Sequence, residues 1–441
     1  MAWQVVIAGG GFGGFYAARA LERLLPPQSA RVTLVNDANF LLYTPLLPGA
    51  AGGTLDPRHV VVSLRSQLRR TELVIGRVTG ADPARATLGV QRIDGEQLDL
   101  AYDQLVVALG SVSRTLPIPG LAEHAIGLKS LSDATALRNQ VLSALDIAES
   151  VEDPAMRAEY LGFVFVGAGY AGVEGLADLQ DFAAQAIELY PRCRAQGMRW
   201  ILVEARERIM QEVPRSLSEF AERELRGRGI EVRTNTTLLD LNARAATLSD
   251  GETVAARTLV WTAGVKPSPV IAQLGLPLDR EGRVVVDRTM RVERQTLALS
   301  GPPGLPHERA RVWAIGDCAA VPDASRPGQP CPPTAQHAIR QGRLVARNVA
   351  ATLAGASPRP FRYRTKGVVA ELGRSQAVAI TLGIRWRGLP AWLIARTYHL
   401  LLMPGLERKL RLLVDWNVAL MFGRDSSSPG RLGSPTPLER D

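Results

Sequence analysis

The feature that most constrains this chain is a pattern that occurs twice: a short apolar run, a glycine-rich turn and then a helical stretch. Residues 3–8 (WQVVIA) precede the loop Gly9–Gly14, a helical stretch and a second apolar run at 31–36. The loop Gly167–Gly172 has the same neighbours. A unit of about 30 residues with this order is typical of a βαβ element. Two such units predict an α/β fold with two Rossmann-like dinucleotide-binding domains.

Both loops match the spacing G-x-G-x-x-G. The matching glycines are Gly9, Gly11 and Gly14 in the first loop and Gly167, Gly169 and Gly172 in the second. The first glycine permits a tight turn, the second lets the backbone approach a pyrophosphate, and the third lets helix and strand pack closely. The intervening Phe12, Gly13 and Tyr170 belong to the same predicted contacts. Glycine turns that serve packing alone are the alternative, which the repetition of the motif in its proper context disfavours.

An acidic residue that holds a ribose is expected at the end of the second strand of each unit. In the second unit this residue is Glu204, which favours NADH over NADPH because a carboxylate repels a 2′-phosphate. The nearby Arg206 and Arg208 weaken that preference, since they can offset the repulsion. The first unit has Asn36 at this position with Asp37 beside it, and either residue is a candidate for the ribose contact.

Composition excludes several classes of protein. The 441 residues contain 5% aromatics, so we expect no stacking platform for nucleic acid, although the net charge is +9. The three cysteines, Cys193, Cys318 and Cys331, form no closely spaced redox dithiol or zinc motif, and the five histidines show no ligand spacing for a metal. The N-terminus lacks the pattern of a signal peptide, and no run of 18 apolar residues occurs. Two dinucleotide folds without a dithiol predict FAD in the first and a nicotinamide in the second.

The motifs occur in an order that resembles the type II NADH dehydrogenases, which are single-subunit, FAD-dependent NADH:quinone oxidoreductases. The matching segments are IAGGGFGG, YTPLLPGAAGGTLDP (43–57), LVVALGS (105–111), VGAGYAGVE (166–174), LVEARERI (202–209), LVWTAGV (259–265), VWAIGDCA (312–319) and PPTAQHAIRQG (332–342). The resemblance implies an FAD domain with an inserted NADH domain, followed by a membrane-binding region. The expected limits are 1–115 and 266–350 for FAD, 116–265 for NADH, 351–424 for the membrane region and 425–441 for a disordered tail.

The resemblance also implies roles for individual residues. Asp317 is expected to bind the ribityl chain of the flavin, and Glu174 to take part in catalysis near the flavin and nicotinamide, with a helix-capping role as its alternative. Gln336 is expected to contact a quinone, because an amide both donates and accepts, with Arg340 one turn away. A solvated helix face is the alternative for that pair. The further residues implied are Gly110, Gly316 and Ala335 for FAD with Gln336, Gly264 for NADH, and Gln341 for the quinone.

The C-terminal region is both apolar and basic. Residues 385–424 contain seven basic residues (Arg385, Arg387, Arg396, Arg408, Lys409, Arg411 and Arg424) against Glu407 and Asp415. Two helical stretches, 391–403 and 406–422, are too short and too charged to span a bilayer but suit an interfacial position. Trp386, Trp392, Tyr398 and Trp416 are residues that favour such interfaces. A helical hairpin buried in a dimer or against the FAD domain is the alternative.

The sequence therefore predicts a peripheral enzyme on the cytoplasmic face of the cell membrane. It oxidises NADH through FAD, reduces a quinone and pumps no protons, since no channel is visible; a homodimer is possible. The main rival is a sulfide:quinone oxidoreductase, which needs a cysteine pair at the flavin, for which Cys193 and Cys331 are the spare candidates. A soluble NADH:ferredoxin-type reductase and an NADH-sensing flavoprotein are further rivals.

Overall fold

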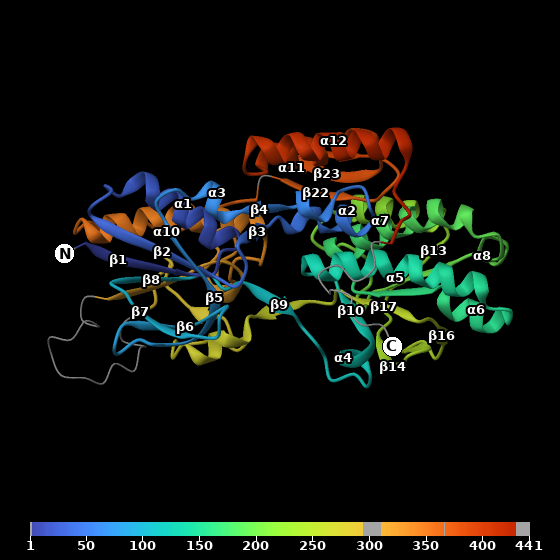
Figure 1. The fold of residues 1–441 in the computed structure, drawn as a ribbon, viewed down its shortest axis with the longest axis horizontal. Coiled ribbons are helices and arrows are strands. Elements are labelled where there is room, and N and C mark those ends of the chain that lie inside the picture. The colour runs from blue at the N-terminus through green and yellow to red at the C-terminus, as the bar shows by residue number, and fades with distance from the viewer. Residues whose placement is uncertain (1, 294–309, 366, 429–441) are drawn as a thin grey trace, which may run out of the picture. The chain divides into compact units, whose positions relative to one another are not determined.

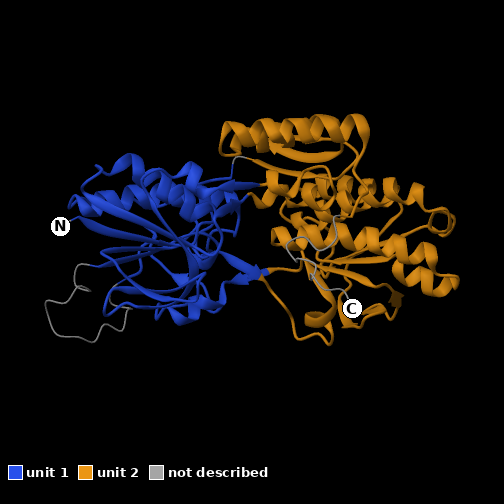
Figure 2. Cartoon of the chain, viewed as in Figure 1, with its two compact units in different colours: residues 1–42, 61–112, 265–365 blue, residues 43–60, 113–264, 366–441 orange. Residues whose placement is uncertain are grey.

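The structure, a computed structural model, describes residues 2–293, 310–365 and 367–428, and the chain divides into two compact units (Figures 1 and 2). Unit 1 comprises residues 1–42, 61–112 and 265–365, and unit 2 comprises 43–60, 113–264 and 366–441. Each unit therefore draws on three separate segments of the chain.

Unit 1 is built on a seven-stranded sheet in the order β20-β8-β1-β2-β5-β6-β7. The strands from β20 to β5 are parallel, and β6 and β7 extend the sheet as an antiparallel meander. Because β2 and β8 flank β1 on opposite sides, the carboxyl end of β1 is the point where the strand order reverses, which is where α/β sheets bind ligands. The glycine loop Gly9–Gly14 follows β1 at this point.

The helices and strands of unit 1 have the following bounds. They are β1 (Trp3–Ala8), α1 (Phe12–Leu24), β2 (Ala30–Asn36), β3 (Phe40–Leu42), β4 (Val61–Ser63), α3 (Leu64–Gln67), β5 (Glu72–Asp82), β6 (Thr87–Arg92), β7 (Gln97–Ala101), β8 (Gln104–Val107), β18 (Val265–Pro267), β19 (Val284–Val285), β20 (Arg311–Ala314), β21 (Ala319–Ala320) and α10 (Ala335–Leu353). Strand β9 (Ser111–Ser113) contains the boundary between the two units, which falls after residue 112.

Unit 2 repeats the same design with a five-stranded parallel sheet in the order β10-β17-β11-β12-β13. Here β11 is flanked by β12 and β17, and the second glycine loop follows β11 at the reversal of strand order. Phe163 of β11 stacks on Trp200 of β12 with ring centroids 4.3 Å apart. All five residues of β11 are buried, as expected for a central strand covered on both faces.

The corresponding bounds in unit 2 are as follows. They are α2 (Leu47–Ala51), α4 (Leu121–His124), β10 (Ala125–Gly127), α5 (Leu131–Ser150), α6 (Pro154–Tyr160), β11 (Gly162–Val166), α7 (Tyr170–Ala186), α8 (Pro191–Gln196), β12 (Arg199–Val203), α9 (Arg215–Gly227), β13 (Ile230–Arg233), β14 (Leu238–Leu241), β15 (Ala245–Leu248), β16 (Thr253–Ala255), β17 (Thr258–Trp261), β22 (Gly367–Glu371), β23 (Ala377–Thr381), β24 (Ile384–Arg387), α11 (Leu389–Leu402) and α12 (Leu406–Phe422).

The C-terminal part of unit 2 is a three-stranded antiparallel sheet, β22-β23-β24, followed by the helices α11 and α12 (Figure 1). Ala391 and Trp392 of α11 pack on Ala377 and Ala379 of β23 in a small apolar cluster. Pro404 and Gly405 separate the two helices, as the sequence predicted. In the part of the chain that the structure describes, every helix is too short or too polar to cross a bilayer.

The close crossing of α1 and α10 in unit 1 depends on one glycine, which yields a test of the fold. A Cβ at Gly342 would collide with the carbonyl of Gly13 and lie 3.2 Å from the backbone nitrogen of Ala17. We expect Gly342→Ala to destabilise the protein by about 1–3 kcal/mol, because neither backbone can yield. Gly227→Ala is the matched control, since Gly227 is also helical and its Cβ would meet nothing within 4 Å. Thermal unfolding measures both, and equal melting temperatures for the two variants would refute the argument.

Candidate dinucleotide sites and an acid-lined pocket

The first glycine loop has the backbone that the sequence motif requires. Gly9 has a φ of +104° and no room for a Cβ, which would collide with the carbonyl of Ala108. A Cβ on Gly14 would collide with the carbonyl of Gly9, so this glycine lets α1 begin against β1. Gly11, by contrast, faces open space within 4 Å. Of the three glycines of the motif, only the middle one, Gly11, is therefore left open to a ligand.

In the second loop, too, the first and third glycines are required by packing and the middle one is open. Gly167 has a φ of +102°, and a Cβ there would lie 2.7 Å from the backbone nitrogen of Ala263. A Cβ on Gly172 would collide with the carbonyl of Gly167, whereas Gly169 faces open space. The helices that start at these loops, α1 and α7, have no side-chain cap at their N-termini and no acid in the first turn. Their first N–H groups therefore suit an anionic pyrophosphate.

The two predicted ribose residues occupy equivalent places in their units. Asn36 ends β2, and its Oδ1 accepts the N–H of Gly10 at 2.7 Å. Glu204 follows β12, and its Oε2 accepts the N–H of Ala168 at 2.8 Å. Each side chain thus bonds the residue between the first two glycines of its own loop. Asp37, the other candidate of the first unit, is exposed.

The arginines beside Glu204 are held by other groups. Arg206 donates its backbone N–H to Glu204 Oε1 at 3.0 Å, and its guanidinium donates to Gln211 at 3.1 Å. Arg208 donates to three backbone carbonyls, those of Met210, Gln211 and Val213. Among the described residues neither guanidinium forms an ion pair with the Glu204 carboxylate, so the acidic character of the position is retained.

The Gly-Asp turn after β20 lies in unit 1 with two other predicted residues. Ser111 donates its hydroxyl to Asp317 Oδ2 at 2.7 Å, and Gly110, which has a φ of +65°, precedes that serine. Gly316 donates its N–H to Gln341 Oε1 at 2.7 Å. Gln341 is 1% exposed, so it supports this turn from within the protein. Its predicted contact with a quinone stays a prediction, and the contact that the structure shows is with the Gly-Asp turn.

The start of α10 brings Gln336 and Arg340 together, as their spacing predicted. The hydroxyl of Tyr363 donates to Gln336 Oε1 at 2.7 Å. Arg340 donates to the backbone carbonyl of Gln336 at 2.9 Å and lies over the ring of Tyr363, 4.1 Å from its centroid. Tyr363, which no sequence motif singled out, therefore orients both side chains. Ala335 is the first residue of the helix, and His337 is buried with its Nδ1 2.8 Å from Thr334 Oγ1.

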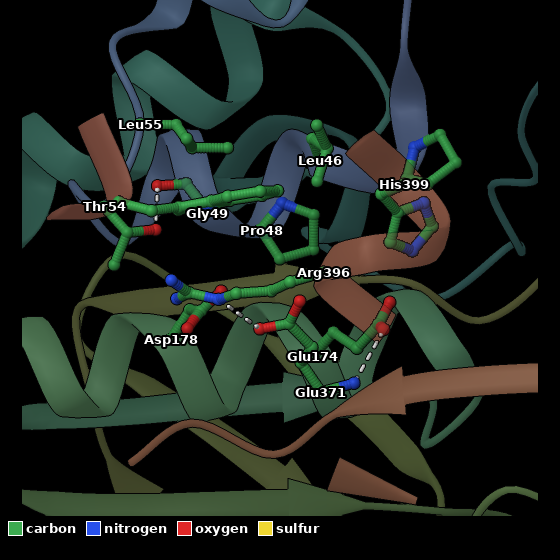
Figure 3. A pocket seen from close by; sticks show the side chains of 12 residues that line it. Leu46, Pro48, Gly49, Thr54, Leu55, Glu174, Asp178, Glu371, Arg396 and His399 are labelled. Atoms are coloured by element: carbon green, nitrogen blue, oxygen red, sulfur yellow. Dashed lines mark hydrogen bonds and ion pairs between the residues drawn. The ribbon is translucent and has the colours of Figure 1, made fainter. Parts of the chain in front are cut away.

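Unit 2 contains a small pocket lined by both acidic and apolar side chains (Figure 3). Glu174, one turn into α7, accepts the backbone N–H of Glu371 at 3.0 Å. Arg396 of α11 approaches the Glu371 carboxylate, with its Nε 3.9 Å from Oε2. The remaining lining residues are Pro45, Leu46, Pro48, Gly49, Thr54, Leu55, Asp178, His399 and Trp416.

Burial governs the ionisation of this pocket. It raises the pKa of Glu174 well above its usual value, although the N–H of Glu371 opposes the shift. It raises the pKa of Glu371 to about 7 and also raises that of Asp178, against the attraction of nearby arginines. It lowers the pKa of His399 to about 4. Burial therefore favours the protonated form of Glu174, leaves Glu371 near its midpoint at neutral pH and keeps His399 uncharged there.

Sequence reasoning missed two features of this pocket. The segment 43–57 was noted only as one of the segments that carry the resemblance, and nothing in the sequence indicated that its residues line the pocket that contains Glu174. Arg396 was counted among lipid-facing basic residues, but it lies between Trp392 and Trp416, 4.0 and 5.0 Å from their ring centroids. Cation–π contacts of this kind stabilise a charged side chain inside a protein.

The cysteines lack the properties of a reactive pair. All three are free and buried. Burial raises the pKa of Cys193 and of Cys318 to about 12 and that of Cys331 to about 11, so their nucleophilic thiolate forms are scarce. Within the described residues, no group of three or more potential metal ligands comes together.

The chain is similar to known proteins over most of its length. The family model described as pyridine nucleotide-disulphide oxidoreductase matches residues 3–342. The type II NADH:quinone oxidoreductase Ndh of Mycobacterium tuberculosis is 32% identical over 96% of this chain and 89% of its own. The chain belongs to the type II NADH dehydrogenases, within the pyridine nucleotide-disulphide oxidoreductase family.

Other type II NADH dehydrogenases and related proteins agree. A demethylphylloquinone reductase of Synechocystis is 30% identical over 94% of this chain and 95% of its own. The NDH2 of Plasmodium falciparum in complex with NADH has a similar fold, with a TM-score of 0.86 over 97% of this chain and 100% of that one at 18% identity. Both glycine loops of this family member, with their open middle glycines and uncapped helices, fit the FAD and NADH expected from the sequence.

The glycines of the second loop permit a test that separates ligand contact from packing. We expect Gly169→Ala to leave the melting temperature of the NADH-free protein unchanged but to weaken NADH binding by about tenfold or more, because its Cβ enters the open space at the helix start. Gly172→Ala should instead lower the melting temperature, because its Cβ collides with Gly167. Calorimetric titration and thermal unfolding measure the two effects. Unchanged NADH affinity in Gly169→Ala would show that the loop serves packing alone.

Proposed function

We propose that this protein is a NADH:quinone oxidoreductase that binds FAD in unit 1 and NADH in unit 2. The balanced reaction is NADH + H⁺ + quinone → NAD⁺ + quinol, and it involves no proton pumping. The observation that carries the proposal is the duplicated glycine loop, open only at Gly11 and Gly169. The names of the relatives supply the acceptor, since the Mycobacterium and Synechocystis proteins are a quinone oxidoreductase and a quinone reductase.

The residues at the start of α10 provide the proposed quinone contact. FAD, when bound, supplies acceptance of a hydride and its release as two electrons. Gln336 can donate its amide N–H to a quinone carbonyl, since its Oε1 is turned to Tyr363. Arg340 adds positive charge, which stabilises the negative charge that develops on a quinone oxygen during reduction. A quinol also needs two protons, and burial favours the protonated forms of the Glu174 and Glu371 carboxyls, which makes them candidate proton donors.

Glu204 provides the proposed preference for NADH. Its carboxylate is fixed by the N–H groups of Ala168 and Arg206, at the position where the ribose of a nicotinamide dinucleotide is expected. A fixed carboxylate accepts from a 2′-hydroxyl and repels a 2′-phosphate. The guanidinium groups of Arg206 and Arg208 are engaged by Gln211 and by backbone carbonyls, which limits their ability to offset that repulsion.

The apolar stripes of α11 and α12 support attachment to a membrane surface. On α12 the side chains of Leu406, Leu410, Leu413, Val414 and Met421 are spaced to share one helix face, and all are exposed. Exposed leucines also recur along α11, at Leu389, Leu393 and Leu401. Two apolar stripes on helices too short to span suit an interfacial position. We place the bound enzyme on the cytoplasmic face of the cell membrane, and a second copy of the chain is the alternative cover for the stripes.

Five of the seven basic residues of this region divide into two groups, and Arg408 and Lys409 are intermediate in exposure. Arg385, Arg387 and Arg411 are exposed and are available to anionic lipid headgroups. Arg396 and Arg424 were counted with them from the sequence, but their side chains are only 15% and 8% exposed and form ion pairs. The electrostatic contribution to membrane binding is therefore smaller than the sequence predicted. The apolar stripes contribute a larger share of the binding free energy.

The quinone contact is tested by separating the two halves of the reaction under anaerobic conditions. We expect NADH to bleach the visible flavin band of the holoenzyme and a short-chain quinone to restore it. In Gln336→Leu the bleaching rate should be unchanged and the recovery about tenfold slower, because one hydrogen bond to the quinone is lost. Arg347→Ala, an exposed change on the same helix, is the control. Bleaching without recovery in the unaltered protein would point to another acceptor, and bleaching by sulfide instead of NADH would favour the sulfide-oxidising rival.

Membrane attachment is tested by adding charge to the apolar stripe of α12. The double variant Leu410→Glu, Val414→Glu should lose at least about tenfold in binding to vesicles of mixed anionic and zwitterionic lipids, because two apolar side chains no longer enter the interface. Leu189→Glu alters an exposed leucine elsewhere in unit 2 and should bind normally. Co-sedimentation with vesicles measures the binding. Normal vesicle binding by the double variant, with a dimer in the unaltered protein that dissociates in the variant, would assign the stripe to a second copy.

A further inference from the structure

The chain that follows α12 stays on unit 2 and inserts one side chain, that of Arg424, into it. We call residues 423–428 the clasp. Arg424 donates from Nη1 to the carbonyl of Gly52 at 2.9 Å and to the carbonyl of Asp178. Its Nη2 lies 3.5 Å from Asp181 Oδ2 and 3.7 Å from Asp178 Oδ1. The side chain is 8% exposed, so this guanidinium is a buried cation.

Further contacts hold the backbone of the clasp. Arg138 of α5 donates to the carbonyl of Asp425 at 2.6 Å and to that of Ser427 at 2.8 Å. The backbone N–H of Arg424 donates to Gln185 Oε1 of α7 at 3.2 Å. Ser427 closes a turn by donating its hydroxyl to Asp425 Oδ1 at 2.7 Å. The sequence predicted a disordered tail from residue 425; residues 425–427 are bound in this way, and 429–441 lie outside the described residues.

The clasp joins two walls of the acid-lined pocket. Pro48 and Gly49 of α2 line the pocket on one side, and Gly52 ends that helix. Asp178 of α7 lines it on the other, and a Cβ on Gly52 would lie only 2.8 Å from the Cβ of Asp178. Because one guanidinium bonds the carbonyls of both Gly52 and Asp178, it ties α2 to α7 at their closest approach.

Of the arginines that act on Asp178, Arg424 of the clasp has the largest effect, and Arg396 and Arg228 add to it. Arg228 and Arg374 are held by Asp181, at 2.6 and 3.2 Å, and Arg396 faces Glu371. Of the ion pairs among the described residues, the one that Asp178 forms is with Arg424. The charged and titratable groups that face this region are Glu174, Asp178 and Asp181 of α7, Glu371 of β22, Arg374 after it, Arg396 and His399 of α11, Arg228 after α9, and Arg424.

We propose that Arg424 is a positioning residue for the reaction: it locks α2 against α7 and places a positive charge beside Asp178, so that Glu174 and Glu371 work in a pocket of fixed shape and charge. This inference rests on the proposed function, in which these two carboxyls hold protons for quinone reduction. The clasp would thereby contribute to the reaction, although Arg424 lies 250 residues beyond Glu174 in the sequence.

The experiment compares four full-length holoenzyme variants with the unaltered protein. Arg424→Gln removes the charge, Arg424→Lys keeps it without the planar fork, and Arg424→Gln combined with Asp178→Asn removes both members of the ion pair. Arg194→Gln is the control, because it removes one exposed arginine from a surface pair in the same unit. The measurements are thermal unfolding between about pH 5 and pH 8 and the pH dependence of flavin reoxidation by a short-chain quinone.

The stability measurement has a defined sign. Burial raises the pKa of Asp178 and of Glu371, and Arg424 lowers both. A carboxyl whose pKa is raised by folding stabilises the protein below its unfolded pKa, and this contribution is lost as the pH rises through the folded pKa. Without Arg424 both pKa values rise further. The melting temperature of Arg424→Gln should therefore fall increasingly below that of the unaltered protein as the pH rises, and the double variant should remove most of that pH-dependent part.

The activity measurement should change in the same direction. We expect the pH profile of reoxidation in Arg424→Gln to move upward by about one unit, because a cation within about 4–6 Å of a carboxyl is lost. Arg424→Lys should move it less. If Arg424→Gln fails to fold, the comparison of Arg424→Lys with the unaltered protein decides the same point.

Two results would overturn the inference. A melting temperature lowered equally at every pH, with an unshifted reoxidation profile, would mean that the clasp is only a mechanical tether. If Arg424→Gln keeps both the melting temperatures and the reoxidation profile of the unaltered protein, Arg424 does not affect the pocket. If no quinone reoxidises the unaltered protein, the proposed function fails, and the pH dependence of unfolding still decides whether Arg424 sets the charge of the pocket.

Discussion

The structure depends on the contact between a helix and the strand that precedes it, made twice with glycine at the point of contact. Gly14 meets the carbonyl of Gly9, and Gly172 meets the carbonyl of Gly167, at distances that no side chain allows. Each contact brings an uncapped helix N-terminus to the edge where the strand order reverses. The same edge receives the ends of β2 and β12, and hence Asn36 and Glu204. The positions of the two glycine loops and of the two ribose candidates follow from these two backbone contacts.

Most of the fold was predictable because it is determined by local patterns. The strand expected at 3–8 is β1, and the helix expected at 406–422 is α12, with the same bounds. The strand after each glycine helix ends at the predicted ribose residue or one residue before it. Buried parallel strands are continuous apolar runs and amphipathic helices have a regular spacing, so a single sequence contains enough information to place them.

The acid-lined pocket was not predictable, because its parts are assembled from distant segments. Segment 43–57, α7, β22, α11 and α12 each contribute, and no local pattern links Glu174 to Glu371 or Asp178 to Arg424. Basic residues between apolar ones were interpreted as a membrane-facing pattern. Arg396 and Arg424 fit that pattern but are turned inward, since tryptophan rings and carboxylates there compensate the loss of water. Gln341 was likewise grouped with Gln336, although Gln336 contacts Tyr363 and Gln341 the backbone of Gly316.

The charged cluster around the pocket is an unfavourable way to stabilise the fold, so its presence needs another explanation. Four carboxyls and four guanidinium groups are brought together there, yet burial outweighs the attraction of the arginines, because the pKa values of Asp178 and Glu371 are raised. A cluster in which ionisation is disfavoured despite its partners costs free energy relative to well-packed apolar residues. Such a cost is commonly retained where proton-holding groups are needed at neutral pH. The same burial that makes this region an inefficient way to stabilise unit 2 therefore favours the protonated forms of Glu174 and Glu371, as the proposed role of these carboxyls requires.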